Sequence, residues 1–396
     1  MEHTWRWFGP GDPISLSDIR QTGASGIVTA LHHIANGEAW PIEEIQERQS
    51  IVADAGLVWS VVESVPLREE IKRGDQSRDR WIANYAQTLR NLAACGIHAV
   101  CYNFSAVLDW TRTDTRFELP DGSWALRFDH RAFAAFDLFV LQRPGARAEY
   151  EDEDFADAER YYRSAAADEL GDLTETIIAG LPGSEETYSL DSLRSAVASY
   201  RGVDAAALRD NLGYFLRKVV PVAEESGVRL AIHPDDPPRS LLGLPRIVST
   251  QTDMQWILDE VPSPANGVTL CTGSLGVRPD NDVPSMVRAF APRIYFAHLR
   301  STRRETDPRD FHESGHLDGD IDMVAIIAEL VAEERRRERD GGPLIPLRPD
   351  HGQRIVDDKN RVTNPGYPLI GRLKGLAELR GVEGAVRALS GEAACG

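Results

Sequence analysis

Four side chains of types that bind divalent metals stand at the ends of short apolar runs in the second half of the chain: His233, Cys271, His298 and Asp350. One such residue at a strand end is usually structural, but four on successive strands favour a shared role. Because the ends of neighbouring parallel strands lie close together, these residues predict a metal site. The four runs, rich in β-branched and aliphatic residues as buried strands are, are Val228–His233, Val268–Cys271, Ile294–His298 and Leu344–Asp350.

The types of ligand constrain the metal ion. Two imidazoles, one thiolate and one carboxylate suit Mn²⁺, Fe²⁺, Co²⁺ or Zn²⁺ better than Mg²⁺ or Ca²⁺. With four protein ligands, catalysis would need an expanded coordination shell to admit substrate oxygens. Mn²⁺ and Fe²⁺ tolerate octahedral coordination and permit this more readily than tetrahedral Zn²⁺.

A second motif suggests a different kind of metal site. The residues His312-Glu313-Ser314-Gly315-His316 match the HExxH pattern of zinc proteases, which requires a helix that places both histidines on one face. The Ser-Gly pair inside the motif, and the aspartates and proline around it, predict a loop instead. We therefore expect no protease site here, although one of these histidines could contact a substrate or support the metal site.

Short strand-like runs alternate with helical patterns through most of the chain, and this alternation is typical of a parallel α/β fold. The first run is followed by Gly9-Pro10-Gly11-Asp12-Pro13, whose prolines cannot donate N–H groups to a dinucleotide, so we exclude a Rossmann fold. Eight such units predict a single (β/α)8 TIM barrel over residues 1–396. Besides the four runs above, the predicted strands are Thr4–Phe8, Gly26–Leu31, Val58–Glu63 and His98–Asn103.

One interval breaks the alternation. Residues 105–209, which follow the fourth predicted strand, include the acidic run Glu149–Glu159 and the turn-rich segment Gly180–Gly183. We predict a largely helical insertion here, serving as a lid or as a contact between subunits. The acidic run is expected to be a solvated helix face.

Charge and composition exclude several classes of partner. The formal net charge of −18 argues against nucleic acids and against anionic lipid surfaces. No secretory signal or membrane-spanning run is visible. The four cysteines form no CxxC pair, so we expect reduced thiols and a cytoplasmic location.

Nine segments spread along the chain carry a resemblance to a known family. They are Trp5–Gly9, Gly26–Leu31, Cys101–Phe104, Asp109–Thr113, Ala179–Ser184, His233–Pro238, Leu270–Gly276, Arg348–Gly352 and Pro365–Tyr367. In these segments the sequence resembles the mannonate dehydratase family, over nearly its whole length. The resemblance implies dehydration of D-mannonate to 2-keto-3-deoxy-D-gluconate, in hexuronate (glucuronate) catabolism, with Mn²⁺ or Fe²⁺.

The resemblance also implies roles for individual residues. The family's metal ligands fall on the four strand-end residues, and its acid/base positions fall on His351 and Tyr367, without deciding which is the acid. Two positions depart from the family: Ser301, where Asn is usual, and Arg239, where an aromatic residue is common.

We expect the substrate to be a small sugar acid bound by Asn103 and by arginines, since a guanidinium group matches a carboxylate bidentately. The candidates are Arg112, Arg300 and Arg348, each of which could instead form a structural ion pair. Two alternatives remain: a metal-dependent sugar isomerase or epimerase on a similar barrel, and a non-catalytic sugar-acid binding protein. Barrels with long insertions are often homo-oligomers, and we expect one here by analogy.

Overall fold

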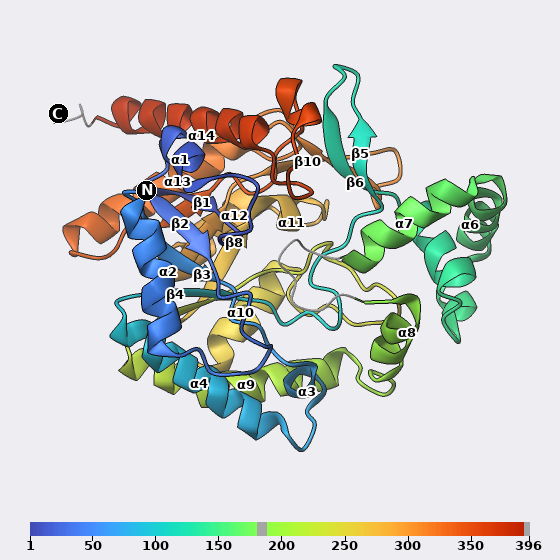
Figure 1. Ribbon diagram of the computed structural model, residues 1–396, viewed down its shortest axis with the longest axis horizontal. Helices are drawn as coiled ribbons and strands as arrows, with labels where there is room; N and C mark the ends of the chain where they lie inside the picture. The colour runs from blue at the N-terminus through green and yellow to red at the C-terminus, as the bar shows by residue number, and fades with distance from the viewer. Residues whose placement is uncertain (180–187, 392–396) are drawn as a thin grey trace.

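The computed structural model describes residues 1–179 and 188–391. Its centre is a closed barrel of eight parallel strands in the order β1-β12-β9-β8-β7-β4-β3-β2, as the sequence predicted (Figure 1). The strands are β1 (Glu2–Arg6), β2 (Gly26–Thr29), β3 (Val58–Glu63), β4 (Ala99–Tyr102), β7 (Arg229–Ile232), β8 (Asn266–Cys271), β9 (Ile294–His298) and β12 (Pro346–Arg348).

The first and last barrel strands differ from their predicted bounds. The first strand starts and stops two residues earlier than the predicted run Thr4–Phe8. The last strand ends at Arg348, which pairs with His298, and Asp350 lies beyond it with a φ of 57°. Because this left-handed backbone cannot continue a strand, the predicted run Leu344–Asp350 is too long at this end.

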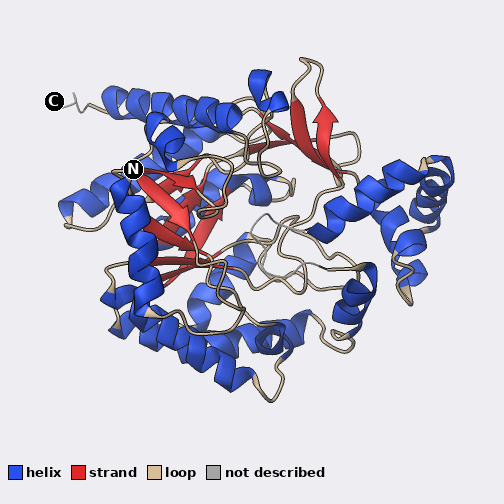
Figure 2. Cartoon of the chain, viewed as in Figure 1, coloured by secondary structure: helices blue, strands red, loops and turns tan. Residues whose placement is uncertain are grey.

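Helices surround the barrel (Figure 2). Several begin at a residue whose side chain accepts a backbone N–H, such as Asp204 and Thr250. Glycines with positive φ follow α2, α4 and α9, as expected where a helix turns back into a strand. The helices are α1 (Leu16–Gln21), α2 (Ile42–Asp54), α3 (Glu69–Arg73), α4 (Arg78–Ala94), α5 (His130–Ala135), α6 (Asp152–Ser164), α7 (Ala167–Ala179), α8 (Leu190–Ala198), α9 (Ala205–Glu225), α10 (Gln251–Glu260), α11 (Thr272–Gly276), α12 (Val283–Phe290), α13 (Met323–Arg339) and α14 (Leu369–Leu389).

The interval after β4 contains a β-hairpin that the sequence analysis did not predict, as well as helices. Strands β5 (Asp114–Glu118) and β6 (Trp124–Phe128) join β10 (Ser301–Arg304) and β11 (Phe311–Ser314) in an antiparallel sheet of order β10-β11-β6-β5. We call this the accessory sheet. Helices α5 to α8 follow, and α6 and α7 lie away from the barrel strands (Figure 1). The segment Gly180–Gly183 and Cys395 lie outside the described residues.

The accessory sheet corrects the prediction of a loop for the HExxH motif. Residues Phe311–Ser314 form β11, in which Phe311 and Glu313 are buried while His312 and Ser314 are half-buried. Pairing with β10 and β6 creates this strand, and four residues with no Gly or Pro are too short for such a strand to be read from periodicity alone. The two histidines do not share a helix face, so the exclusion of a protease site stands.

The barrel has two apolar layers because side chains alternate along each strand. One cluster fills the barrel interior and includes Val28, Val61, Ala231 and Phe296. The other and larger cluster packs the outward-facing strand residues against the helices. Among the described residues, no helix is long and apolar enough to cross a membrane.

The packing of the last helix gives a stability prediction. On α14, Leu376 is fully buried whereas Leu373 is 37% exposed. Replacing Leu376 by Ala should lower the free energy of unfolding by about 2–5 kcal/mol, because it leaves a cavity against the barrel. Leu373→Ala should cost less than about 1 kcal/mol. Urea denaturation followed by circular dichroism measures both, and equal losses would contradict the packing described here.

Candidate metal centre and active site

The alternation that fills the barrel interior also determines which side chains reach its mouth. Phe296 belongs to the interior cluster, so His298, two residues later, faces the mouth at the end of β9. The same count from Ala231 reaches His233, and Cys271 ends β8 directly opposite His298 in the strand register. Neighbouring strands thus deliver three donors to one place.

His233, Cys271 and His298 form a compact group whose donor atoms lie within 4.8 Å of one another. The two imidazoles approach most closely, with His233 Nε2 3.1 Å from His298 Nδ1. Cys271 and His298 are fully buried. Three of the four predicted ligands therefore lie together.

The chemistry of this group fits a divalent transition metal. Burial lowers the pKa of His233, and burial with the nearby Arg348 holds the pKa of His298 well below its usual value, so both rings are neutral and carry a lone pair. His298 Nε2 is buried with no hydrogen-bond partner among the described residues. Burial raises the pKa of the Cys271 thiol to about 12, and a cation that displaces this proton gains a thiolate ligand.

Asp350, the fourth predicted ligand, lies beside this group. Its Oδ2 is 3.8 Å from Cys271 Sγ and 2.6 Å from Arg300 Nε, and its Oδ1 accepts a hydrogen bond from Arg348. Burial alone would raise its pKa, but Arg348 and the other cationic groups nearby hold the pKa well below the usual value. Asp350 is therefore an ionised carboxylate at the edge of the three-donor group.

His351 and Tyr367 lie together on the same side of the mouth. Their rings are perpendicular with centroids 5.1 Å apart, and Trp110 packs edge-on against His351. Both residues are almost fully buried. Burial raises the pKa of Tyr367 to about 12, so its phenol is protonated at neutral pH.

The three predicted substrate-binding arginines are all buried and all bound to carboxylates. Arg112 donates to Asp236 at 2.7 Å and to Glu313 at 2.9 Å, and Arg300 donates to the same two carboxylates. Pairing with these carboxylates offsets the cost of burying the two guanidinium charges.

Arg348 forms a separate ion pair with Glu63 Oε1, at 2.8 Å. Glu63 Oε1 also lies 3.4 Å from His298 Nε2, and Oε2 has no hydrogen-bond partner among the described residues. Glu63 thus connects the three-donor group to the arginines.

The sequence analysis missed Glu63, Asp236 and Glu313. Glu63 is the last residue of a predicted strand, so the rule that selected His298 also selects it. Asp236 stands in the segment His233–Pro238 that carries the resemblance. Glu313 belongs to the HExxH motif, which was predicted to be a loop. Its residues form a strand only by pairing within the accessory sheet.

A small cavity of about 20 Å³ lies at the barrel mouth, with room for about one water-sized occupant. Neither Ser301 nor Arg239 lines it. Ser301 is buried and packs against Gly319. Arg239 donates a hydrogen bond to the Pro308 carbonyl at 3.5 Å. The lining residues are Glu63, Asn103, Asp109, Trp110, His233, Asp236, Arg300, Arg348, Asp350, His351 and Tyr367.

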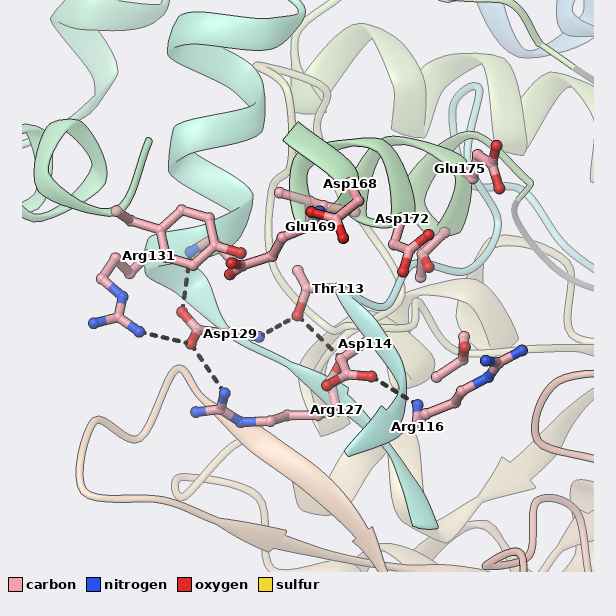
Figure 3. A pocket seen from close by; sticks show the side chains of 15 residues that line it. Thr113, Asp114, Arg116, Arg127, Asp129, Arg131, Asp168, Glu169, Asp172 and Glu175 are labelled. Atoms are coloured by element: carbon pink, nitrogen blue, oxygen red, sulfur yellow. Dashed lines mark hydrogen bonds and ion pairs between the residues drawn. The ribbon is translucent and has the colours of Figure 1, made fainter. Parts of the chain in front are cut away.

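A larger hollow of about 580 Å³ lies between the β5–β6 hairpin and α7 (Figure 3). Carboxylates of α7, including Asp168 and Asp172, face the hairpin there, and Asp129 pairs with Arg127 at 3.1 Å and with Arg131 at 3.5 Å. It contains no histidine or cysteine among its described lining residues. The smaller cavity, not this hollow, therefore holds the groups suited to metal and proton-transfer chemistry.

Comparisons with known proteins found relatives that match nearly the whole chain. A family model described as "D-mannonate dehydratase (UxuA)" matches residues 1–392. The chain is 65% identical over 391 residues to a mannonate dehydratase of Chromohalobacter salexigens, covering 98% of this chain and 100% of that protein. It is 56% identical over 384 residues to a mannonate dehydratase of Marinomonas sp., covering 97% of this chain and 98% of that protein.

Solved structures add two similarities. The crystal structure of mannonate dehydratase from Streptococcus suis serotype 2 has a TM-score of 0.76 at 35% identity, covering 99% of this chain and 95% of that one. A xylose isomerase domain protein from Planctomyces limnophilus has a TM-score of 0.51 at 10% identity, covering 98% of this chain and 97% of that one. This similarity shows the fold alone. The family model and both curated relatives span almost the whole sequence, and the chain belongs to the D-mannonate dehydratase family.

Proposed function

We propose that this chain dehydrates D-mannonate to 2-keto-3-deoxy-D-gluconate, a step of hexuronate breakdown, with a bound Mn²⁺ or Fe²⁺ ion. The observation that carries the proposal is the group of His233, Cys271 and His298 in a member of this family. One of the three, His233, lines the same cavity as the two buried proton-transfer groups, His351 and Tyr367. The test is formation of a 2-keto acid from D-mannonate by the purified protein.

His233, Cys271 and His298 would hold the ion, with Asp350 as the fourth ligand. When bound, the ion supplies positive charge that stabilises the negative charge developing near the substrate carboxylate as the C2 proton leaves. The two neutral imidazoles and the soft thiolate favour Mn²⁺, Fe²⁺, Co²⁺ or Zn²⁺ over Mg²⁺ and Ca²⁺.

We assign the base to His351 and the acid to Tyr367. An imidazole can accept a proton near neutral pH, so His351 removes the C2 proton. Tyr367, whose pKa burial raises to about 12, keeps its proton until it donates it to the departing C3 hydroxyl, which leaves as water. The enol then loses its O–H proton to the Tyr367 phenolate and gains a proton at C3 from His351, which restores both residues.

Asn103 lines the cavity and can hydrogen-bond substrate hydroxyls through its amide. Arg112, Arg300 and Arg348 remain candidates for contact with the substrate carboxylate, but each would have to share a guanidinium group that already binds a carboxylate. We therefore give the ion the larger part in holding the substrate carboxylate.

We also propose a cytoplasmic homo-oligomer in which part of residues 105–209 acts as a lid or as a subunit contact. The described cysteines, Cys95, Cys101 and Cys271, are free thiols, as in a reducing compartment. Sedimentation analysis tests the oligomeric state.

Metal removal tests the proposed role of the ion. The purified protein should contain about one Mn²⁺ or Fe²⁺ ion per chain. Chelation should abolish formation of the keto acid, because the arginines at the mouth are already paired with carboxylates and the ion supplies most of the stabilising charge. Adding Mn²⁺ or Fe²⁺ back should restore turnover, and Cys271→Ser should weaken metal binding at least tenfold. Elemental analysis beside the keto-acid assay measures both, and full activity in metal-free protein would exclude this mechanism.

Substitution of the proton-transfer groups separates an enzyme from a binding protein. His351→Asn and Tyr367→Phe should each lower kcat by about 10²–10⁴-fold, while metal content stays at the wild-type value. Steady-state kinetics on D-mannonate gives the loss, and product analysis by chromatography distinguishes a keto acid from the epimer or isomer that a sugar isomerase would form. Unchanged turnover in both variants would refute the assignment.

A further inference from the structure

We propose that Glu313 is a positioning residue that fixes the orientation and tautomer of the His351 imidazole. The inference rests on the proposed function, in which His351 moves the C2 proton, and it assigns a use to the one carboxylate of the HExxH motif. Glu313 comes from β11 of the accessory sheet and reaches the barrel mouth from outside the barrel.

The contact between the two residues is direct and dry. Glu313 Oε1 lies 3.2 Å from His351 Nδ1, and each side chain is 2% exposed. The other carboxylate near the ring, Asp350, is 4.0 Å from Nε2, which is beyond hydrogen-bond distance. The hydrogen bond at Nδ1 is thus the polar contact that sets the ring's rotation, while Trp110 and Tyr367 pack against it edge-on.

An ionised carboxylate can only accept a hydrogen bond, so Nδ1 must carry the proton. In the neutral ring the lone pair then lies on Nε2, the nitrogen left available to a substrate in the cavity that His351 lines. Without this contact both tautomers are accessible, and one of them presents an N–H where the proposed reaction needs a base.

Glu313 is itself held rigidly. Its Oε1 accepts from Arg112 Nη2 at 2.9 Å and from Arg300 Nη1, and both arginines are anchored by Asp236. Two guanidinium groups bound to one carboxylate leave it little freedom to rotate, so its position defines that of the imidazole. A role as counter-ion for these arginines alone is the competing explanation, and the experiment must separate the two.

The chain offers a matched control. Directly after β10 of the accessory sheet, Glu305 Oε1 lies 3.2 Å from His312 Nδ1, and Glu305 also binds an arginine, Arg127. This Glu–His contact has the same length but is less buried, and neither residue lines the cavity. Glu305→Gln therefore removes a Glu–His contact of equal length without touching the mouth.

Glu313→Gln should lower kcat by about 10²–10⁴-fold, as loss of the orienting carboxylate does in catalytic triads, with KM changed less than about threefold and metal content unchanged. Glu305→Gln should stay within about twofold of wild type. In a His351→Asn background, Glu313→Gln should cost little more, because a residue that acts through His351 has nothing left to position. An equal loss in both backgrounds would reduce Glu313 to a counter-ion.

The tautomer can be observed without any substrate. In zinc-substituted protein, which avoids paramagnetic broadening, ¹⁵N spectra of the histidines should show His351 protonated at Nδ1, assigned by the signal lost in His351→Asn. Glu313→Gln should shift that signal toward the other tautomer, and Glu305→Gln should not. If Glu313→Gln fails to fold, Glu313→Asp keeps a negative charge near the two arginines, which can follow it with their long side chains, while the shorter side chain lengthens the contact with Nδ1. It should fold normally and show the same kinetic and spectral changes.

An unchanged His351 spectrum in these variants would overturn the proposal. If the wild-type protein instead made no keto acid from D-mannonate, the proposed function would fail while the spectra still decided whether Glu313 sets the tautomer.

Discussion

Alternation of side chains along the barrel strands is the constraint on which the site depends. A residue two positions beyond an interior side chain must face the mouth, because successive side chains in a strand point to opposite faces. The interior cluster contains Val61, Ala231 and Phe296, and the mouth accordingly receives Glu63, His233 and His298. A slip of one residue in any of these strands would turn that side chain outward into the layer of helices. The register of the hydrophobic core and the position of the proposed metal ligands therefore depend on the same alternation.

Buried charge imposes the second condition. Arg112, Arg300 and Arg348 are buried at the barrel mouth, and a buried charge is costly unless it is paired and hydrogen-bonded. Asp236 and Glu313 serve Arg112 and Arg300, and Asp350 and Glu63 serve Arg348. The arginines thus hold the carboxylates in fixed directions as much as the reverse. The arginines predicted from the sequence as substrate ligands therefore also hold neighbouring carboxylates in place, and two of them, Arg300 and Arg348, line the cavity themselves.

The barrel and the grouping of His233, Cys271 and His298 could be predicted from the sequence because both follow from local patterns. These patterns are apolar runs of strand length and the residue type at the end of each run. The orientation of the Asp350 side chain could not be predicted, because it depends on a left-handed backbone conformation two residues past the strand. The hairpin β5–β6 did leave a local signal, since Pro120-Asp121-Gly122 between two strand-like runs is a turn sequence and Gly122 has a φ of 80°. Strand β11 left almost none, because its four residues become a strand only by pairing with segments far away in the chain.

The accessory sheet gives the interval after β4 a part in the site. Arg112 immediately precedes the hairpin, and its guanidinium group packs over the ring of Phe311 on β11, 4.8 Å from the centroid. Phe311 in turn stacks on Phe128 of β6, with centroids 5.7 Å apart. Arg112 and Glu313 are thus brought together by one sheet whose strands come from two loops of the barrel, those after β4 and β9. Their ion pair forms only when both loops are folded against each other. The orientation of His351 is consequently tied to the assembly of a sheet that lies wholly outside the barrel.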